Sequence, residues 1–261
     1  MRLPGKMIGD PMGDFDGDGI LNGMDGCPTI DAAQPGGRSD QDHDGVPDIC
    51  DPNPTIPGDC VALFDDFGDP ALSPLWQYDG NPIEVIRNDP IFMNQPYLQF
   101  DAADDEVIYL DKLIDLDAVS ARIYAQAGDN PAPGQHAIEL YVDLTHSALG
   151  RADGEACAVE SSNRNGMVEH VRTIDGAGTI LASTPAPLNA LRVGSGNTFT
   201  VEWGAAAAPN ACSATKDPTD PMALYAVDAK VPPSGTFAIR GRGVGLFILA
   251  VVGWGHNCAA N

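Results

Sequence analysis

Two acidic loops of one design lie between residues 14 and 51, and they constrain this chain more than any other feature. In each loop, side chains that carry oxygen stand at positions 1, 3, 5, 9 and 12, and a glycine stands at position 6. The first loop has Asp14, Asp16, Asp18, Asn22 and Asp25 with Gly19, and the second has Asp40, Asp42, Asp44, Asp48 and Asp51 with Gly45. Asp and Gly are common in solvated loops, but two copies with identical offsets indicate a binding site.

This residue pattern matches the chemistry of a hard cation. Ca2+ takes six to eight oxygen ligands, and alternate acidic residues around a glycine turn can surround it. Position 7 would add a backbone carbonyl, and the carboxylate at position 12 would close the shell. Mg2+ prefers a small octahedron that keeps several waters, and no ligand position carries a soft atom that a transition metal would favour. The sequence therefore predicts two or more Ca2+ ions, with the ligands Asp14, Asp16, Asp18, Ile20, Asn22, Asp25, Asp40, Asp42, Asp44, Val46, Asp48 and Asp51.

The residues after each loop distinguish the families that use such loops. In an EF-hand or a dockerin a helix starts near position 10, whereas here Gly26, Cys27 and Pro28 follow Asp25 and cannot start one. DFDGDGILNGMDGCP and DQDHDGVPDICD instead resemble the longer and shorter motifs of a thrombospondin type 3 repeat, over about residues 10–53. The departures from that pattern are Asn22 for Asp, Gly26 for Asn, a slightly short spacer after Cys27, and Pro47 for Gly. The resemblance implies a calcium-filled, nearly core-less segment in which Cys27 pairs with Cys50.

The charge of this region supports the same interpretation independently. Residues 10–59 hold twelve Asp, no Glu and one basic residue, Arg38. Without cations the segment would repel itself, and its few apolar residues cannot build an ordinary core. Bound calcium should take the place of a hydrophobic core. The free energy of calcium binding then contributes directly to the free energy of folding. We expect chelation to disorder this segment and to spare the rest of the protein.

The chain divides by composition into four parts. We expect residues 1–13 to be a flexible lead, 14–51 the thrombospondin type 3-like repeat, 52–59 a proline-rich linker and 60–261 a β-sandwich domain. Proline fixes backbone angles, so the linker should be semi-rigid and hold the repeat at a defined angle.

Beyond residue 59 short apolar alternations lie between turn residues, which predicts an antiparallel β-sandwich in an all-β protein. The strands are expected at 83–88, 97–101, 106–114, 118–128, 136–145, 166–174, 190–194, 197–204, 224–231, 235–243 and 246–255. The opening FDDFGDPALSPLW, the later TFTVEW, LYAVDAKV and SGTFAIR and a last apolar strand resemble the concanavalin-like, laminin G-like jelly rolls of bacterial surface proteins. In such a fold the first and last strands are neighbours, which would bring Cys60 near Cys258. Cys157 and Cys212 would then tether two long loops, although four cysteines allow three connectivities.

Six cysteines without a C-x-x-C spacing indicate disulfides and an extracellular, secreted or cell-surface protein. The start, MRLPGKMIGDPMGD, has no apolar signal region, so the export signal is expected upstream of this chain or lost by truncation. A net charge of −23 disfavours nucleic acid and anionic membranes as partners, and no run approaches the ~20 apolar residues of a membrane span.

The sequence predicts no enzyme. It has no G-x-S-x-G, H-E-x-x-H or P-loop motif, and Glu139 and Asp143 would stand roughly 13 Å apart on a strand, as solvated acids. Trp76, Trp203 and Trp254 are expected in the core, and His43 in solvent.

We therefore expect a calcium-binding structural or adhesion protein, with a glycan or another surface protein as partner. The alternatives are a carbohydrate-binding domain, recognisable by exposed aromatic residues at one rim, and a polysaccharide-active enzyme, which needs convergent carboxylates.

Overall fold

In a computed structural model of the chain, regular structure is almost entirely β-strand. The exception among the described residues is the short 3-10 helix η1 (Asn22–Met24). The predicted all-β class is confirmed. No helix in the described part of the chain is long and apolar enough to span a membrane. The structure describes residues 6–7, 9–69, 71–79, 83–87, 89, 95–100, 106–110, 116–127, 136–144, 154–161, 169–175, 179–188, 191, 196–204, 211–216, 224–228 and 236–256.

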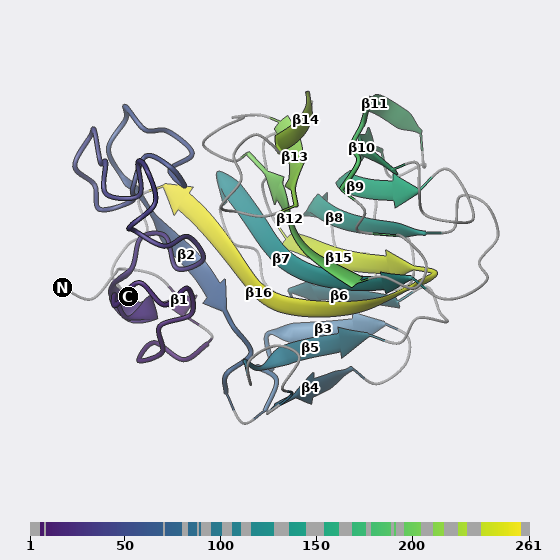
Figure 1. Cartoon of the computed structure of the whole chain (residues 1–261), viewed down its shortest axis with the longest axis horizontal. Coiled ribbons are helices and arrows are strands. Elements are labelled where there is room, and N and C mark those ends of the chain that lie inside the picture. The colour runs from purple at the N-terminus through teal and green to yellow at the C-terminus, as the bar shows by residue number, and fades with distance from the viewer. Residues whose placement is uncertain are drawn as a thin grey trace.

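The first of two sheets runs in the order β1-β2-β16-β7-β12-β13-β14, and β5 with β4 joins it beside β16 (Figure 1). Strand β1 is parallel to β2, and the other pairs are antiparallel. The bounds are β1 (Lys6–Met7), β2 (Asp59–Asp65), β4 (Glu84–Ile86), β5 (Tyr97–Phe100), β7 (Ala118–Ala127), β12 (Gly196–Trp203), β13 (Ala211–Thr215), β14 (Leu224–Asp228) and β16 (Val244–His256). The sandwich's first strand, β2, therefore lies beside the last, β16, as expected.

The second sheet is antiparallel throughout its described strands, in the order β11-β10-β9-β8-β15-β6-β3. Its strands are β3 (Trp76–Asp79), β6 (Glu106–Leu110), β8 (Ala137–Leu144), β9 (Glu155–Ser161), β10 (Glu169–Ile174), β11 (Ile180–Pro185) and β15 (Thr236–Arg242). The two sheets pack on each other and form the predicted β-sandwich.

The main core lies between the sheets and follows from alternation along the strands. Ile138 and Leu140 of β8 face Phe199 and Trp203 of β12 in one cluster of fully buried side chains. The three tryptophans, Trp76, Trp203 and Trp254, are at most 3% exposed, which confirms their predicted place in the core.

A disulfide crosses this core. Cys157 on β9 bonds to Cys212 on β13, so the bond joins the two sheets. This bond belongs to one of the three connectivities that the sequence left open. The expectation that it tethers long loops is wrong, because both residues lie within buried strands. Cys60 is also disulfide-bonded, and its expected partner Cys258 lies outside the described residues.

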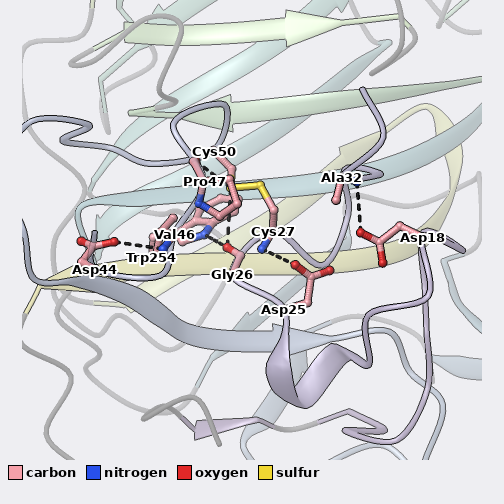
Figure 2. Close-up of a disulfide and its surroundings, with 10 residues drawn as sticks. All are labelled: Asp18, Asp25, Gly26, Cys27, Ala32, Asp44, Val46, Pro47, Cys50 and Trp254. Carbon is pink, nitrogen blue, oxygen red and sulfur yellow. Dashed lines mark hydrogen bonds between the residues drawn. A yellow bond between two sulfur atoms is a disulfide. The ribbon is translucent and has the colours of Figure 1, made fainter. Parts of the chain in front are cut away.

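The acidic segment, drawn in purple in Figure 1, packs against the outer face of the first sheet at β2 and β16. Phe15 meets Phe64 of β2 edge to face at a centroid distance of 6.0 Å. The indole Nε1 of Trp254 on β16 donates a hydrogen bond to the Gly26 carbonyl at 3.0 Å, and Figure 2 shows it beneath the Cys27–Cys50 disulfide. Strand β16 is therefore covered on both faces, which explains its continuous apolar run.

One expectation about the flanks of the repeat needs correction. Within the predicted flexible lead, Lys6 and Met7 form β1 because the edge of β2 offers free backbone groups. On the other side, the repeat and the sandwich share one apolar cluster. The few apolar residues of the repeat build no core of their own, as predicted, but Phe15 and Val46 complete one with β2 and β16.

The predicted strands are present except at 190–194, where Leu191 alone is described and has no strand conformation. From β4 onward, the strands that the sequence missed are β9, β11 and β13. Their sequences, EACAVES, ILASTP and ACSAT, are rich in Ala and Ser, which have weak strand preference. Pairing within the two sheets makes these segments strands despite that composition.

Candidate metal centre

The leading carboxylates of each acidic loop converge. Asp14, Asp16 and Asp18 each offer an oxygen within 4.8 Å of the others, and the same holds for Asp40, Asp42 and Asp44. Positions 1, 3 and 5 of both predicted loops are thus brought together.

The two loops share one hydrogen-bond pattern. The first carboxylate of each loop accepts hydrogen bonds from the backbone N–H groups at positions 4 and 6. These donors are Gly17 and Gly19 on Asp14, at 2.9 and 3.0 Å, and His43 and Gly45 on Asp40, at 2.7 and 3.1 Å. Because the pattern repeats at the same offsets, the loops close in the same way.

The glycine at position 6 is required by backbone conformation. Gly19 and Gly45 have φ angles of +87° and +100°, and no atom lies within 4 Å of where a Cβ would be. The constraint is therefore the left-handed backbone that glycine adopts without strain. His43, at position 4, takes a similar φ of +66° and is exposed, as expected for a residue that is no ligand.

In each loop, the carboxylate at position 5 accepts hydrogen bonds from backbone N–H groups that lie after the loop in the sequence. Asp18 Oδ2 accepts a hydrogen bond from Ala32 N at 3.0 Å. Asp44 Oδ2 accepts from Gly58 N and Asp59 N at 2.9 and 2.6 Å. The second loop is thereby tied to the start of β2.

The carboxylates at position 12 are buried, and only one of the two oxygens in each accepts a hydrogen bond. Asp25 and Asp51 are 4% and 0% exposed. One oxygen of each accepts a backbone hydrogen bond, from Cys27 at 2.8 Å and from Asn53 at 2.7 Å. The other oxygen, Oδ2, is buried without a hydrogen-bond donor in both residues. A buried carboxylate oxygen without a donor costs free energy unless a cation meets it.

The pKa values of these acids also indicate that their negative charges lack a compensating positive charge. Burial, followed by the charge of nearby carboxylates, raises the pKa of Asp16 to about 6 and that of Asp25 to about 7. Burial and then Asp59 raise the pKa of Asp51 to about 8. A bound divalent cation would reverse this effect by favouring the ionised form.

The side chains at position 9 are engaged elsewhere. Asn22 accepts a hydrogen bond from Phe15 N at 2.9 Å and donates one to the Asp10 carbonyl at 2.9 Å. Asp48 accepts hydrogen bonds from Ser39 Oγ and from Gln41 N. Asp48 therefore does not lie among the converging carboxylates, and the Asn22 amide oxygen already accepts a hydrogen bond. For position 7, the Ile20 and Val46 carbonyls stay predicted ligands.

The donor set fits Ca2+. All the converging atoms are carboxylate oxygens, the ligands that a hard cation prefers. Four buried oxygens of the two loops have no hydrogen-bond donor: Oδ2 of Asp16, Asp25, Asp42 and Asp51, at positions 3 and 12. When bound, the ion would supply the positive charge that this segment, with its single Arg, lacks. Asp14, Asp16 and Asp18 would hold one ion, and Asp40, Asp42 and Asp44 another. Asp25 and Asp51 stay predicted closing ligands.

Sequence reasoning missed Asp59. Its carboxylate lies within 4.8 Å of those of Asp44 and Asp51, although it was assigned to the linker. Asp59 stands 15 residues after Asp44 and the first loop has Ala33 at the same offset, so the internal repeat gave no signal for it.

Glu139 does not occupy the solvated position expected of it. It is 2% exposed, accepts a hydrogen bond from the Tyr141 hydroxyl at 2.8 Å, and pairs with Arg242 and Arg240 at 2.5 and 3.4 Å. Two guanidinium groups offset part of the cost of burying this carboxylate. The side chain of Asp143 lies outside the described residues.

Comparisons with known proteins identify no family for this chain. No protein-family model matches it, and no curated protein matches it. Among solved structures, the exoplasmic/lumenal domain of VIP36 in its Ca2+/Man3GlcNAc-bound form aligns with a TM-score of 0.44 and 12% identity, over 72% of this chain and 86% of that one.

Two other solved structures align to a similar degree. The legume lectin-like domain from Entamoeba histolytica has a TM-score of 0.44 and 10% identity, over 67% of this chain and 87% of its own. The Bacillus licheniformis beta-glucanase has a TM-score of 0.45 and 9% identity, over 73% of this chain and 96% of its own.

Proposed function

We propose that this protein is an extracellular calcium-binding structural or adhesion protein. At least two Ca2+ ions fold residues 14–51, and the folded segment completes one face of the sandwich, which acts as the recognition module. The observation that carries this proposal is the pair of buried position-12 acids, Asp25 and Asp51, each with an oxygen that has no hydrogen-bond donor. A cation bound beside each acid would satisfy that oxygen.

The segment is best explained as a thrombospondin type 3-like repeat. The Cys27–Cys50 disulfide supports this proposal, because it is the pairing that the resemblance implies. Its role differs from that of a free spacer, since Phe15 and Gly26 contact β2 and β16. Calcium therefore acts on the sandwich as well as on the repeat.

An oxidising location accounts for the cysteines. The described residues include no free cysteine. Disulfides persist in secreted and cell-surface proteins, where thiols are not kept reduced. The Ca2+ concentration outside cells is also high enough to fill sites of modest affinity, which range from about 10⁻⁴ to 10⁻³ M in extracellular modules.

Calcium titration of the intact chain by calorimetry tests the proposal. Asp16→Asn and Asp42→Asn each remove one carboxylate from one loop, and we expect each to weaken or abolish binding in that loop alone. Asp69→Asn is the control, because Asp69 is exposed and outside both loops. No measurable Ca2+ binding by the wild-type chain would overturn the proposal.

Carbohydrate binding is the other function to test in the sandwich. Carbohydrate binding would be favoured by a rim of exposed aromatic residues. Among the described side chains, Tyr78 is the one large aromatic residue that is exposed, at 46%. A glycan array probed with the intact chain in calcium and in chelator separates the two functions. Calcium-dependent binding to a defined glycan would identify the sandwich as a lectin, and cleavage of a polysaccharide would identify an enzyme.

A further inference from the structure

A third group of carboxylates lies where the second loop meets the sandwich. Asp44 and Asp51 come from the loop, and Asp59 is the first residue of β2. One oxygen of each lies within 4.8 Å of the others. Asp51 and Asp59 are 0% and 3% exposed, so two of the three acids are shielded from water.

The donors around this group leave one oxygen unsatisfied. Asn53 serves both buried acids, because its N–H donates to Asp51 Oδ1 at 2.7 Å and its amide nitrogen to Asp59 Oδ2 at 3.1 Å. Asp51 Oδ2 is buried and has no donor. His256 Nδ1 lies 3.1 Å from Asp59 Oδ1, and its side chain is 38% exposed. One imidazolium supplies at most one positive charge to three carboxylates.

The first loop provides an internal comparison. The two loops are offset by 26 residues, from Asp14 to Asp40, so the counterparts of Asp44, Asp51 and Asp59 are Asp18, Asp25 and Ala33. Ala33 is exposed and has no ligand atom in its side chain. A third carboxylate at this place is therefore specific to the second loop, which is the loop that adjoins β2.

We propose that Asp44, Asp51 and Asp59 bind a further hard divalent cation, Ca2+, which ties the second loop to the first strand of the sandwich. The proposal rests on the proposed function, because Asp44 and Asp51 are also ligands of the second loop. Asp59 is not, so this residue separates the two ideas. The three acids supply three oxygen ligands, and water or backbone carbonyls complete a shell of six to eight.

The ion would couple the two parts of the protein. Asp59 precedes Cys60 and Val61, which lie in the strand that pairs with β16. The Asp44 carboxylate already accepts hydrogen bonds from Gly58 N and Asp59 N. A cation shared by these acids makes docking of the repeat depend on calcium directly, and not only through folding of the loops.

Counting bound calcium in the intact chain tests this site. Equilibrium dialysis should show that Asp59→Asn binds one Ca2+ fewer per chain than the wild type. Asp65→Asn is the matched control, since Asp65 is also a buried acid of β2 but its oxygens accept hydrogen bonds from Trp76 Nε1 and Phe67 N. This variant should bind as many ions as the wild type, even if it melts at a lower temperature.

A second measurement uses the wild-type protein, so it does not require any variant to fold. Anomalous diffraction from wild-type crystals grown in calcium should give a peak bounded by Asp44, Asp51 and Asp59, separate from the peaks in the two loops. Loop peaks without this third peak, or an unchanged ion count in Asp59→Asn, would overturn the inference and leave the proposed function intact. A wild-type chain that binds no calcium would overturn both.

Discussion

At the scale of single residues, the glycine at position 6 decides whether an acidic loop can close. Gly45 has a φ of +100° with open space where a Cβ would be, so an added methyl group meets no atom but strains the backbone. For a residue other than glycine, the left-handed conformation costs about 1–2 kcal/mol. The loop can relax when it is empty, so the strain falls mainly on the calcium-bound state.

We therefore expect Gly45→Ala to lower the calcium affinity of the second loop about 5- to 30-fold, measured by calorimetric titration. Gly36→Ala is the control, because Gly36 also has a positive φ, +89°, and open space but lies outside both loops. It should lower stability without changing affinity. Equal losses of affinity in both variants would show that strain in the segment as a whole, and not in the loop, controls binding.

The buried acids make the stability of the calcium-free protein depend on pH. The pKa values of Asp25 and Asp51 rise to about 7 and about 8, from an ordinary value of 3.8. The folded state then binds protons more tightly than the unfolded state, so stability is greatest at acidic pH and falls as pH rises from about 4 to 8. Calcium holds these carboxylates ionised and should remove most of that loss.

Thermal melts in chelator should therefore show a melting temperature that falls between pH 5 and pH 8, and the gain on adding calcium should be larger at pH 8. Asp51→Asn cannot titrate at this position, so its melting temperature in chelator should depend less on pH. A calcium-induced gain that is the same at both pH values would contradict the assignment of these acids as ligands.

Among single residues, the sequence predicted the carboxylates at positions 1, 3 and 5 and the glycines, because ligand chemistry and backbone conformation are local. It did not predict that Asn22 would bond to Phe15 and Asp10, or that Asp59 would approach Asp51. These contacts depend on how the segment folds back on itself and on β2, and spacing along the chain carries no information about that.

At the scale of elements, the bond between β9 and β13 fixes one sheet on the other. The chain between Cys157 and Cys212 spans 55 residues, and a bond that closes a loop of this length stabilises by about 4 kcal/mol in the chain-entropy account. Both cysteines are fully buried, so their replacement also disturbs packing.

The double variant Cys157→Ala/Cys212→Ala should therefore lose about 4 kcal/mol in the free energy of unfolding, measured by denaturant titration in calcium. Cys27→Ala/Cys50→Ala is the comparison, since its bond spans 23 residues of the acidic segment. That variant should weaken calcium binding, whereas the first should leave calcium affinity unchanged. A change of calcium affinity in the β9–β13 variant would mean that the two regions are coupled through the core.

At the scale of the whole molecule, the acidic segment is a cover for β2 and β16. Phe64, Val252 and Trp254 of those strands are at most 3% exposed, and they cluster with Phe15 and Val46 of the segment. Removing calcium should uncover this face. We therefore expect chelation to affect β2 and β16 as well as the segment, and not to spare the whole sandwich.

Hydrogen exchange with and without chelator measures this effect. Amides of β2 and the second half of β16 should exchange faster without calcium, because local opening there no longer has to displace the segment. Strands β9 and β10 lie in the other sheet and serve as the internal control. Equal exchange of β2 in both conditions would show that the sandwich does not depend on its cover.

The sequence by itself determined that this protein has two oxygen-lined loops and an all-β domain after them, because ligand type, glycine placement and strand alternation are properties of nearby residues. Only the tertiary structure decided that the loops lie on the sandwich and that Asp59 joins the second one. The reason is that burial is created by distant residues: the hydrogen bond that fixes Gly26 comes from Trp254, which lies 228 positions further along the chain.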